Sequence, residues 1–275
     1  MKLFANNLYV VSTPIGNLDD ITIRGISVLK KSDIIFCENT KHSSKLFRHI
    51  NINPLYVEKY TDHDFDLNHN YIKQKIEQGK IISLISDAGS PLISDPGAKL
   101  IKYLFENNCH VESIPGPSSL TMAIQLCGFL NPNPFVFLGF LPKKIQQKKK
   151  IFENIISSNL IFFTTSSQLN KEIELLSELD SNANVVILNE LTKIYEKKIH
   201  FNLSNFMELL PMNLKGELVV CVEFNEVKHN KKFDDNTLLK DIEKYGKKNI
   251  YEIYSTKYKI KRNELYKRIL SLKKN

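Results

Sequence analysis

The sequence predicts an α/β protein with two sheet domains, a parallel-sheet N-terminal domain and a mixed-sheet C-terminal domain, followed by a small basic helical extension. Three observations support this: short apolar runs alternate with helical patterns in the first half, one later run alternates polar and apolar residues, and the basic charge lies at the end. Alternating strands and helices are typical of a parallel sheet covered on both faces. We place the domains at 1–117, 118–225 and 226–275.

The elements of the first domain follow from runs of β-branched and aromatic residues, each followed by helical spacing. A helix from Asp66 ends at Gly79, which suits a helix C-terminus. Asp95 and Pro96 are expected as N-cap and first residue of the last helix. The expected strands are 8–12, 33–37, 55–60, 81–85 and 110–114, and the helices between them begin near 23, 38, 66 and 98.

The second domain shows the same alternation with one exception. Residues 195–203 alternate polar and apolar side chains, as a half-exposed antiparallel strand does. The helix at 143–157 starts with lysines, which oppose the helix dipole and therefore suggest a charged partner. The other expected strands are 135–140, 160–164, 185–191 and 217–224, and the other helices are 118–127, 169–179 and a short one capped by Ser204.

The whole formal net charge of +8 lies in the last fifty residues, which contain 15 Lys and Arg but only 7 Asp and Glu. A neutral body with a basic tail indicates a polyanionic partner, with nucleic acid as the first candidate, although a lysine-rich solubilising tail fits equally. Residues 226–236 are expected as a linker. The helical spacing beyond them predicts two or three short helices, either a helix-turn-helix in outline or an amphipathic cap.

The four cysteines are scattered, and no signal-peptide pattern or membrane-length apolar run is present. Scattered cysteines mostly within apolar patterns favour reduced thiols in a cytoplasmic protein. We expect no membrane association. The seven histidines lack ligand spacing, so we expect no metal site.

The stretch from Ser86 to Gly97 (SDAGSPLISDPG) is the strongest candidate for a site. It joins a buried strand to a helix, at the edge of the sheet where open α/β folds bind ligands. Gly89 lacks a Cβ, so a ligand can approach the backbone there. The alternative is an ordinary connecting loop.

Six motifs in register resemble the tetrapyrrole-methylase-fold methyltransferases, and among these the enzymes that modify small-subunit ribosomal RNA. The resemblance runs from about Leu8 to Phe224. The motifs are YVVSTPIGNLDDIT (9–22), SDAGSPLISDPG (86–97), IPGPSS (114–119), FLGFLP (137–142), ELTK (190–193) and KGE (215–217).

The resemblance implies S-adenosylmethionine as cofactor, bound in a cleft between two α/β domains, and 2′-O-methylation of a cytidine ribose in the decoding centre of 16S rRNA. It also implies a homodimer. The small ribosomal subunit is then the partner. The cofactor-binding residues that it implies are Asp87, Ala88, Gly89, Ser90, Pro115, Ser118, Ser119, Thr164, Thr165 and Leu191.

Methyl transfer to a weakly acidic hydroxyl needs alignment and is helped by a base or hydrogen-bond acceptor. Glu38, Asp19 and Asp20 are the candidates, and helix capping or surface charge is the alternative for each. Lys41 would serve as a cation on the substrate phosphates. The remaining substrate contacts that we expect are Pro14, Gly16, Asn17, Lys148, Lys149 and Lys193.

The sequence departs from the family pattern on the substrate side. Asn39 and Lys41 stand in ENTK where the family usually has EDTR, and 163–168 reads FTTSSQ where it usually has YESPHR. Gln147-Lys-Lys149 likewise replaces an Arg-rich pair. Lysine cannot make the bidentate fork of arginine. Two alternatives therefore stay open: a same-fold enzyme acting on a tetrapyrrole or other small molecule, and a ribosome-binding protein with decayed catalysis.

Overall fold

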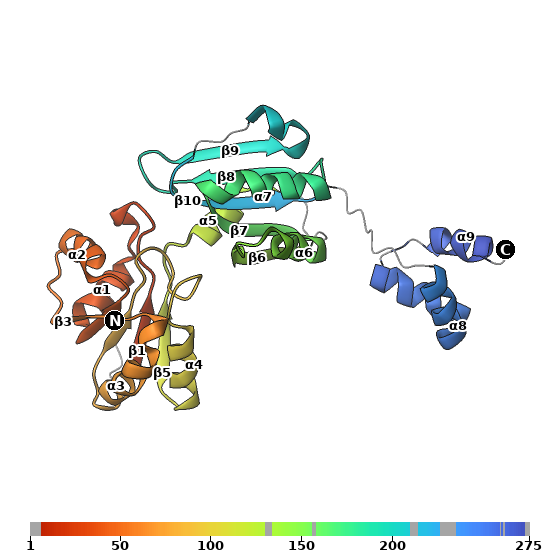
Figure 1. The fold of residues 1–275 in the computed structure, drawn as a ribbon. Coiled ribbons are helices and arrows are strands. Elements are labelled where there is room, and N and C mark those ends of the chain that lie inside the picture. Colours follow the sequence, from red (N-terminus) through yellow and green to blue (C-terminus); the bar gives the residue numbers. More distant parts are fainter. Residues whose placement is uncertain are drawn as a thin grey trace. The chain divides into compact units, whose positions relative to one another are not determined.

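The computed structural model describes residues 7–129, 134–155, 158–209, 214–225, 235–258, 260 and 262–272. The chain divides into two compact units, Met1–Asn225 and Glu226–Asn275. The first contains two five-stranded sheets, and the second is helical (Figure 1).

The N-terminal sheet is entirely parallel, with strand order β3-β2-β4-β1-β5. Its strands are β1 (Asn7–Val11), β2 (Ile34–Cys37), β3 (Tyr56–Lys59), β4 (Ile82–Leu84) and β5 (His110–Ile114). Its helices are α1 (Ile23–Lys31), α2 (Thr40–His49), α3 (Phe65–Glu77) and α4 (Ala98–Glu106), with the short 3₁₀ helices η1 (Leu18–Asp20) and η2 (Asp62–Asp64).

Both faces of this sheet are covered, because alternate residues of a strand point to opposite sides. Tyr9 and Val11 of β1 pack in one core with α1 and α2. Leu8 and Val10 pack in another core with α3 and α4. This arrangement explains why the inner strand β2 is apolar throughout, and it confirms the predicted parallel sheet.

The second sheet is mixed, with strand order β6-β7-β10-β8-β9, and only β6 and β7 run parallel. The strand expected at 195–203 is indeed antiparallel to its neighbour. The strands are β6 (Phe135–Phe140), β7 (Asn159–Thr165), β8 (Asn184–Asn189), β9 (Lys197–Asn202) and β10 (Glu217–Glu223). The helices are α5 (Ser119–Leu126), α6 (Ile145–Ile155), α7 (Ser166–Leu179) and the 3₁₀ helix η3 (Leu203–Leu209).

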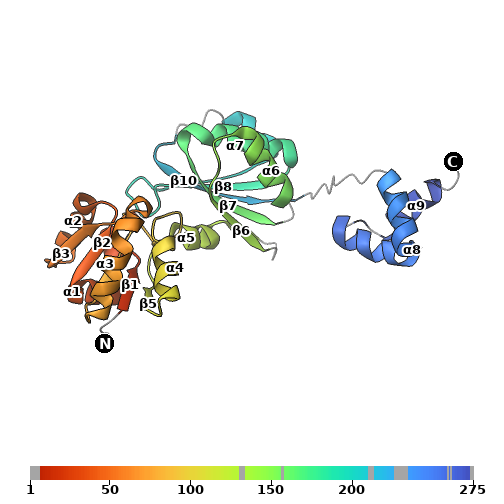
Figure 2. The same ribbon diagram turned by 60° about the horizontal axis from the view of Figure 1, so that its bottom comes forward.

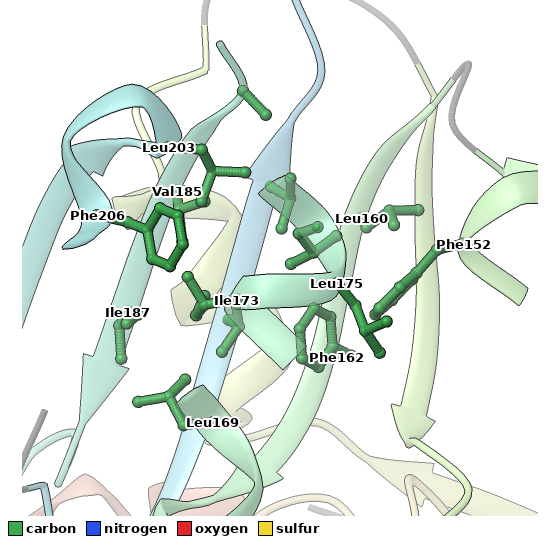
Figure 3. Close-up of a cluster of buried hydrophobic side chains, with 14 of the residues drawn as sticks. Phe152, Leu160, Phe162, Leu169, Ile173, Leu175, Val185, Ile187, Leu203 and Phe206 are labelled. Atoms are coloured by element: carbon green, nitrogen blue, oxygen red, sulfur yellow. The ribbon is translucent and has the colours of Figure 1, made fainter. Parts of the chain in front are cut away.

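Helices α6 and α7 cover one face of this sheet (Figure 2). Phe152 of α6 and Ile173 of α7 pack there against Phe162 of β7 (Figure 3). Ala123 of α5 packs in a core that contains Val219 and Cys221, on the opposite side of β10. Helices therefore cover both faces of the second sheet, which has its own cores.

The helical unit has its own core, formed by Leu238, Ile250, Tyr254, Leu265 and Ile269. It consists of α8 (Asp235–Tyr258) and α9 (Arg262–Leu272). Non-helical backbone at Gly246 (φ 77°, ψ 151°) divides α8 into two segments. The predicted set of two or three short helices is thus confirmed. The linker was expected at 226–236; residues 226–234 lie outside the described residues, and Asp235 and Asn236 belong to α8.

The helix start near 98 is confirmed, but its predicted N-cap, Asp95, and first residue, Pro96, are wrong. Helix α4 begins at Ala98, and its N-cap is Gly97, whose φ of +124° is outside the helical region. The Asp95 side chain is instead hydrogen-bonded to Ser86, so it is not free to cap the helix. Of the helices in the described ranges, none combines the length and the apolarity that a membrane span requires.

Candidate active site

The loop after β4 is fixed to the loop after β1 by backbone hydrogen bonds. The N–H of Thr13 donates to the carbonyl of Gly89 (2.8 Å), and the N–H of Gly89 donates to the carbonyl of Thr13 (3.0 Å). The Ser86 hydroxyl also donates to the Gly89 carbonyl (3.2 Å). Gly89 has a φ of +81°, a conformation that side chains with a Cβ rarely adopt. These bonds hold residues 86–90 in a tight turn at the carboxyl edge of the sheet.

The turn between β5 and α5 lies beside this loop. The Ser90 hydroxyl donates to the carbonyl of Pro117 (3.1 Å), and its oxygen is 3.0 Å from the Ser12 hydroxyl oxygen. A Cβ on Gly116 would come within 2.9 Å of the Ser12 Cβ, so these segments approach as closely as glycine permits. Ser118 ends the turn as the N-cap residue of α5. The loops after β1, β4 and β5 therefore form one connected edge.

A cavity of about 460 Å³ opens between this edge and the second sheet. Its walls combine apolar side chains, exposed backbone of glycine-containing loops and three acidic residues. That volume and mixture suit a small-molecule ligand with both apolar and charged parts. The lining residues are Ile15, Ala88, Gly89, Ser90, Ile93, Ser94, Asp95, Ser118, Ser119, Phe140, Phe163, Leu188, Glu190, Leu191, Lys193, Gly216, Glu217, Leu218 and Val219.

Two loops, one from each sheet, meet beside the cavity. The N–H of Asn17 donates to the Thr192 hydroxyl (2.9 Å). A Cβ on Gly16 would lie 2.5 Å from Cγ of Lys193 and 2.9 Å from the carbonyl oxygen of Leu191. Glycine at position 16 thus allows the loop after β1 to touch the turn after β8.

An acidic group lies behind the loop after β4. Glu38 follows β2, and its carboxylate accepts a hydrogen bond from the backbone N–H of Asp87. Burial, and then the negative charges of Asp95 and Asp87, raise the pKa of Glu38 to about 7. Burial, followed by the charges of Glu217 and Asp87, raises the pKa of Asp95 to about 6. Both carboxyls therefore exchange protons near neutral pH, as a general base must.

Of the residues expected to bind the cofactor, six line the cavity: Ala88, Gly89, Ser90, Ser118, Ser119 and Leu191. Asp87, Pro115, Thr164 and Thr165 do not. Thr164 is buried on the other side of β7, so the strand presents Phe163 to the cavity instead. Thr164 therefore does not line the cavity, and its expected contact with the cofactor stays a prediction.

The other acidic candidates differ from Glu38. Asp19 and Asp20 are exposed on η1, and the Asp19 carboxylate lies 2.8 Å from Nε2 of His49. Lys41 is exposed in the first turn of α2. That helix is capped by Asn39, whose side-chain oxygen accepts hydrogen bonds from the N–H groups of Lys41 (3.1 Å) and His42 (3.2 Å).

The residues expected to contact the substrate differ in their exposure and in their distance from the cavity along the chain. Pro14 is buried, while Gly16 and Asn17 are exposed where the two loops meet. Lys193 lines the cavity and pairs with Glu190 (2.9 Å). Lys149 is exposed on α6 and pairs with Glu178 (2.9 Å).

Lys148 is not placed as expected. Its side chain is only 2% exposed, and its ammonium is ion-paired with the equally buried carboxylate of Glu172. Gln168 accepts a further hydrogen bond from it (3.0 Å). This burial and pairing argue against the expected substrate contact of Lys148, which stays a prediction.

Sequence reasoning missed Ile15, Phe140 and Phe163 as cavity residues. Phe140 and Phe163 are neighbours across β6 and β7, with ring centroids 5.5 Å apart. Phe140 lies in the FLGFLP motif, and Phe163 opens FTTSSQ, the stretch that departs from the family pattern. Strand alternation counted from the buried Ile161 would have pointed to Phe163.

Comparisons with known proteins show which family this chain belongs to. Residues 7–206 match the family model described as Tetrapyrrole (Corrin/Porphyrin) Methylases. A Rickettsia prowazekii (strain Madrid E) protein named Ribosomal RNA small subunit methyltransferase I is 41% identical over 266 residues, covering 94% of this chain and 93% of that protein. A protein of the same name from Buchnera aphidicola subsp. Acyrthosiphon pisum is 32% identical, covering 98% of both chains.

Solved structures show the same fold. A cobalt precorrin-4 methyltransferase aligns with a TM-score of 0.59 at 15% identity, covering 79% of this chain and 94% of the other. A uroporphyrin III C-methyltransferase from Thermus thermophilus aligns with a TM-score of 0.55 at 13% identity, covering 78% and 96%. Identities this low carry the fold and nothing more specific.

Proposed function

Since the chain belongs to the tetrapyrrole (corrin/porphyrin) methylase family, and its relatives there are named ribosomal RNA small subunit methyltransferase I, we propose that it methylates ribosomal RNA. The acceptor in this proposal is the ribose 2′-hydroxyl of a cytidine in the decoding centre of 16S rRNA. The observation that carries it is the 41% identity to the Rickettsia protein along nearly the full length of both chains. The charge of the last fifty residues favours RNA over a tetrapyrrole, which needs no polycation.

S-adenosylmethionine is the methyl donor of this family, and the cavity fits it. Its volume of about 460 Å³ lies within the range of small-molecule sites. The backbone at Ala88–Ser90 would hold polar groups of the donor, and Phe163 and Leu188 would contact its apolar parts. Asp95, Glu190 and Glu217 give the cavity the negative charge that suits a sulfonium cation. When bound, the donor supplies an electrophilic methyl group.

The protein's part in the reaction is alignment and proton removal. As the ribose oxygen forms its bond to the methyl carbon, the bond from that carbon to sulfur breaks and the hydroxyl proton must leave. We assign the removal of that proton to Glu38, which is held next to the cavity-lining Ala88–Ser90 loop by the hydrogen bond from the Asp87 N–H. Its pKa, raised to about 7, suits a general base. Lys193 and Lys41 are exposed cations suited to the phosphates of the substrate.

The proposal is tested by transfer of labelled methyl groups to small ribosomal subunits from cells that lack this modification, followed by mapping of the labelled nucleotide. We expect label on the 2′-oxygen of a decoding-centre cytidine. Subunits that already carry the modification are the control and should accept no label. Label on another nucleotide would show that the proposed acceptor is wrong. Cofactor binding without any labelled RNA would favour a ribosome-binding protein with decayed catalysis.

Replacing Gly89 by Ala should weaken S-adenosylmethionine binding about tenfold or more. The left-handed backbone costs an alanine about 1–2 kcal/mol, and the new Cβ would lie 3.1 Å from Cγ2 of Ile15. The loop must then shift at the cavity wall. Titration calorimetry with the cofactor measures the loss.

Gly128→Ala is the matched control for this variant. Gly128 also has a positive φ (66°), but an added Cβ would meet nothing within 4 Å, and the residue does not line the cavity. It should bind the cofactor as the unchanged protein does. Equal binding by both variants would show that the Gly89 loop does not hold the donor.

Removing residues 226–275 should weaken RNA binding and leave cofactor binding intact. The removed unit carries the whole net charge and has its own core, so the first unit keeps its packing. Affinity for small subunits, measured at several salt concentrations, should fall together with its salt dependence. A full-length variant with exposed Lys240, Lys244 and Lys248 changed to Gln should show the same trend. Unchanged RNA affinity in both proteins would contradict the assignment.

The homodimer that the resemblance implies and the cytoplasmic location that the scattered cysteines favour both stay predictions. Sedimentation of the purified protein over a range of concentrations tests the first, and cell fractionation tests the second.

A further inference from the structure

The turn between β8 and β9, residues 190–196, exposes two large apolar side chains next to each other. Ile194 is 94% exposed and Tyr195 is 77% exposed. Single exposed apolar residues are common on protein surfaces and need no explanation. This pair differs in two ways: hydrogen bonds hold its turn in an unusual backbone conformation, and the turn begins at residues that line the cavity.

The backbone of the turn is held in an unfavourable conformation. Glu190 (φ 54°) and Thr192 (φ 63°) both adopt left-handed conformations that residues other than glycine usually avoid. The N–H of Thr192 donates to the Glu196 carboxylate (2.7 Å), and the Thr192 hydroxyl accepts from the N–H of Asn17 (2.9 Å). The N–H of Lys193 donates to the Glu190 carbonyl (3.0 Å). Strain that the surroundings maintain in this way is typical of functional sites.

The turn begins in the wall of the cofactor cavity. Glu190, Leu191 and Lys193 line the cavity, so Ile194 and Tyr195 follow directly on a wall residue. Lys193, Lys197 and Lys198 are exposed on the same segment. Glu190 pairs with Lys193 and Glu196 with Lys198, and Lys197 has no ion-pair partner among the described residues. An exposed aromatic ring flanked by lysines is suited to nucleic acid, because the ring can stack on a base while the cations meet phosphates.

We propose that Tyr195 stacks on an unpaired base of the ribosomal RNA that flanks the target nucleotide. The hydrogen-bonded turn presents the ring two residues after the cavity-lining Lys193, and Ile194 extends the apolar contact. Tyr195 is therefore a positioning residue for the RNA and takes no part in proton transfer. This inference rests on the proposed function, since it requires an RNA substrate.

The test is steady-state methylation of small subunits by Tyr195→Ala at saturating cofactor. Stacking of one base changes affinity by about 5-fold to 150-fold, so we expect KM for subunits to rise about tenfold or more. The kcat value and the affinity for S-adenosylmethionine should stay unchanged, and Tyr195→Phe, which keeps the ring, should behave as the unchanged protein. Tyr56→Ala removes another exposed tyrosine (62%), on β3, and should have no effect.

Three results would overturn the inference. The first is an unchanged KM in Tyr195→Ala while the unchanged protein methylates subunits, which would leave the proposed function intact. The second is a Tyr195→Ala protein that sediments as a smaller species, because the ring would then belong to a contact between copies of this chain. The third is an unchanged protein that methylates no ribosomal RNA, which would overturn the proposed function as well.

Discussion

Replacing Glu38 by Gln is expected to lower the rate of methyl transfer about 100-fold or more at pH 8, with little change in S-adenosylmethionine binding. A positioned general base contributes roughly 10²-fold to 10⁴-fold, and glutamine keeps the shape of the side chain but cannot take the proton. Glu38 does not line the cavity, so cofactor affinity should survive. Single-turnover methylation of subunits and calorimetric cofactor titration measure the two quantities separately.

The pH dependence of the unchanged enzyme provides a second readout. Only the ionised carboxylate accepts a proton, and the pKa of Glu38 is raised to about 7, chiefly by burial. The rate should therefore rise with pH up to about 7 and level off above it, and the Glu38→Gln variant should lose this step. Asp20→Asn is the matched control, because Asp20 was an equal candidate in the sequence but is exposed on η1. A large loss in Asp20→Asn, with Glu38→Gln active, would move the base to the loop after β1.

The ionised Glu38 carboxylate, which the reaction needs, should lower the stability of the folded protein. The pKa of Glu38 is higher in the folded protein (about 7) than in an unfolded chain (about 4.3), so the folded state binds more protons between these values. The contribution of Glu38 to stability is therefore full below about pH 4 and is lost as pH rises through 7. Glu38→Gln should unfold at a higher temperature than the unchanged protein at pH 8, and the gain should vanish near pH 4. A variant inactive through misfolding would instead be less stable at pH 8.

The elements could be predicted from the sequence because their signals are local. Apolar runs such as Ile82–Leu84 and the glycine-containing loop after them mark a strand and its connection without knowledge of partners. The same locality explains the failure at Asp95, which has the residue type of an N-cap and is followed by proline. Its hydrogen bond to Ser86 depends on how the loop between these two residues folds back on itself, and no local preference specifies that.

The site could be predicted only in outline. The loop at Ala88–Ser90 was found because a strand end with glycine is informative by itself. The raised pKa of Glu38 comes chiefly from burial and then from the charges of Asp95 and Asp87, which follow a different strand, so it appears only when β2 and β4 are adjacent. Tyr195 had no distinguishing sequence feature, since its importance comes from exposure in a turn that Asn17 helps to hold.

Lys148 shows how a charge run can mislead. Residues 143–150 contain five lysines, and a basic helix start normally means a solvated face. Lys148 and Phe152 are four residues apart, however, so they lie on the same side of α6, and that side faces the core. The partner that makes burial tolerable, Glu172, is on another helix and cannot be inferred from spacing.

Replacing Lys148 by Met should destabilise the first unit by about 3–5 kcal/mol, the largest stability loss that we expect from a single substitution in this chain. The change leaves the Glu172 carboxylate buried without its counter-charge, and breaking one side of a buried pair costs that much. The double variant Lys148→Met, Glu172→Leu removes both charges and should recover most of the loss, because apolar residues of similar volume can replace a buried ion pair. Thermal unfolding of the three proteins measures the differences.

Lys149→Met is the control, since Lys149 pairs with Glu178 on the surface, where both side chains are about half exposed (47% and 56%). An exposed pair contributes roughly 0–1 kcal/mol, so this variant should unfold close to the unchanged protein. The double variant also decides between structure and recognition at position 148. If it is stable and methylates ribosomal subunits normally, the ammonium serves packing alone. A stable double variant with weakened binding to subunits would mean that Lys148 leaves its pair to meet RNA, and would restore the role that its burial argues against.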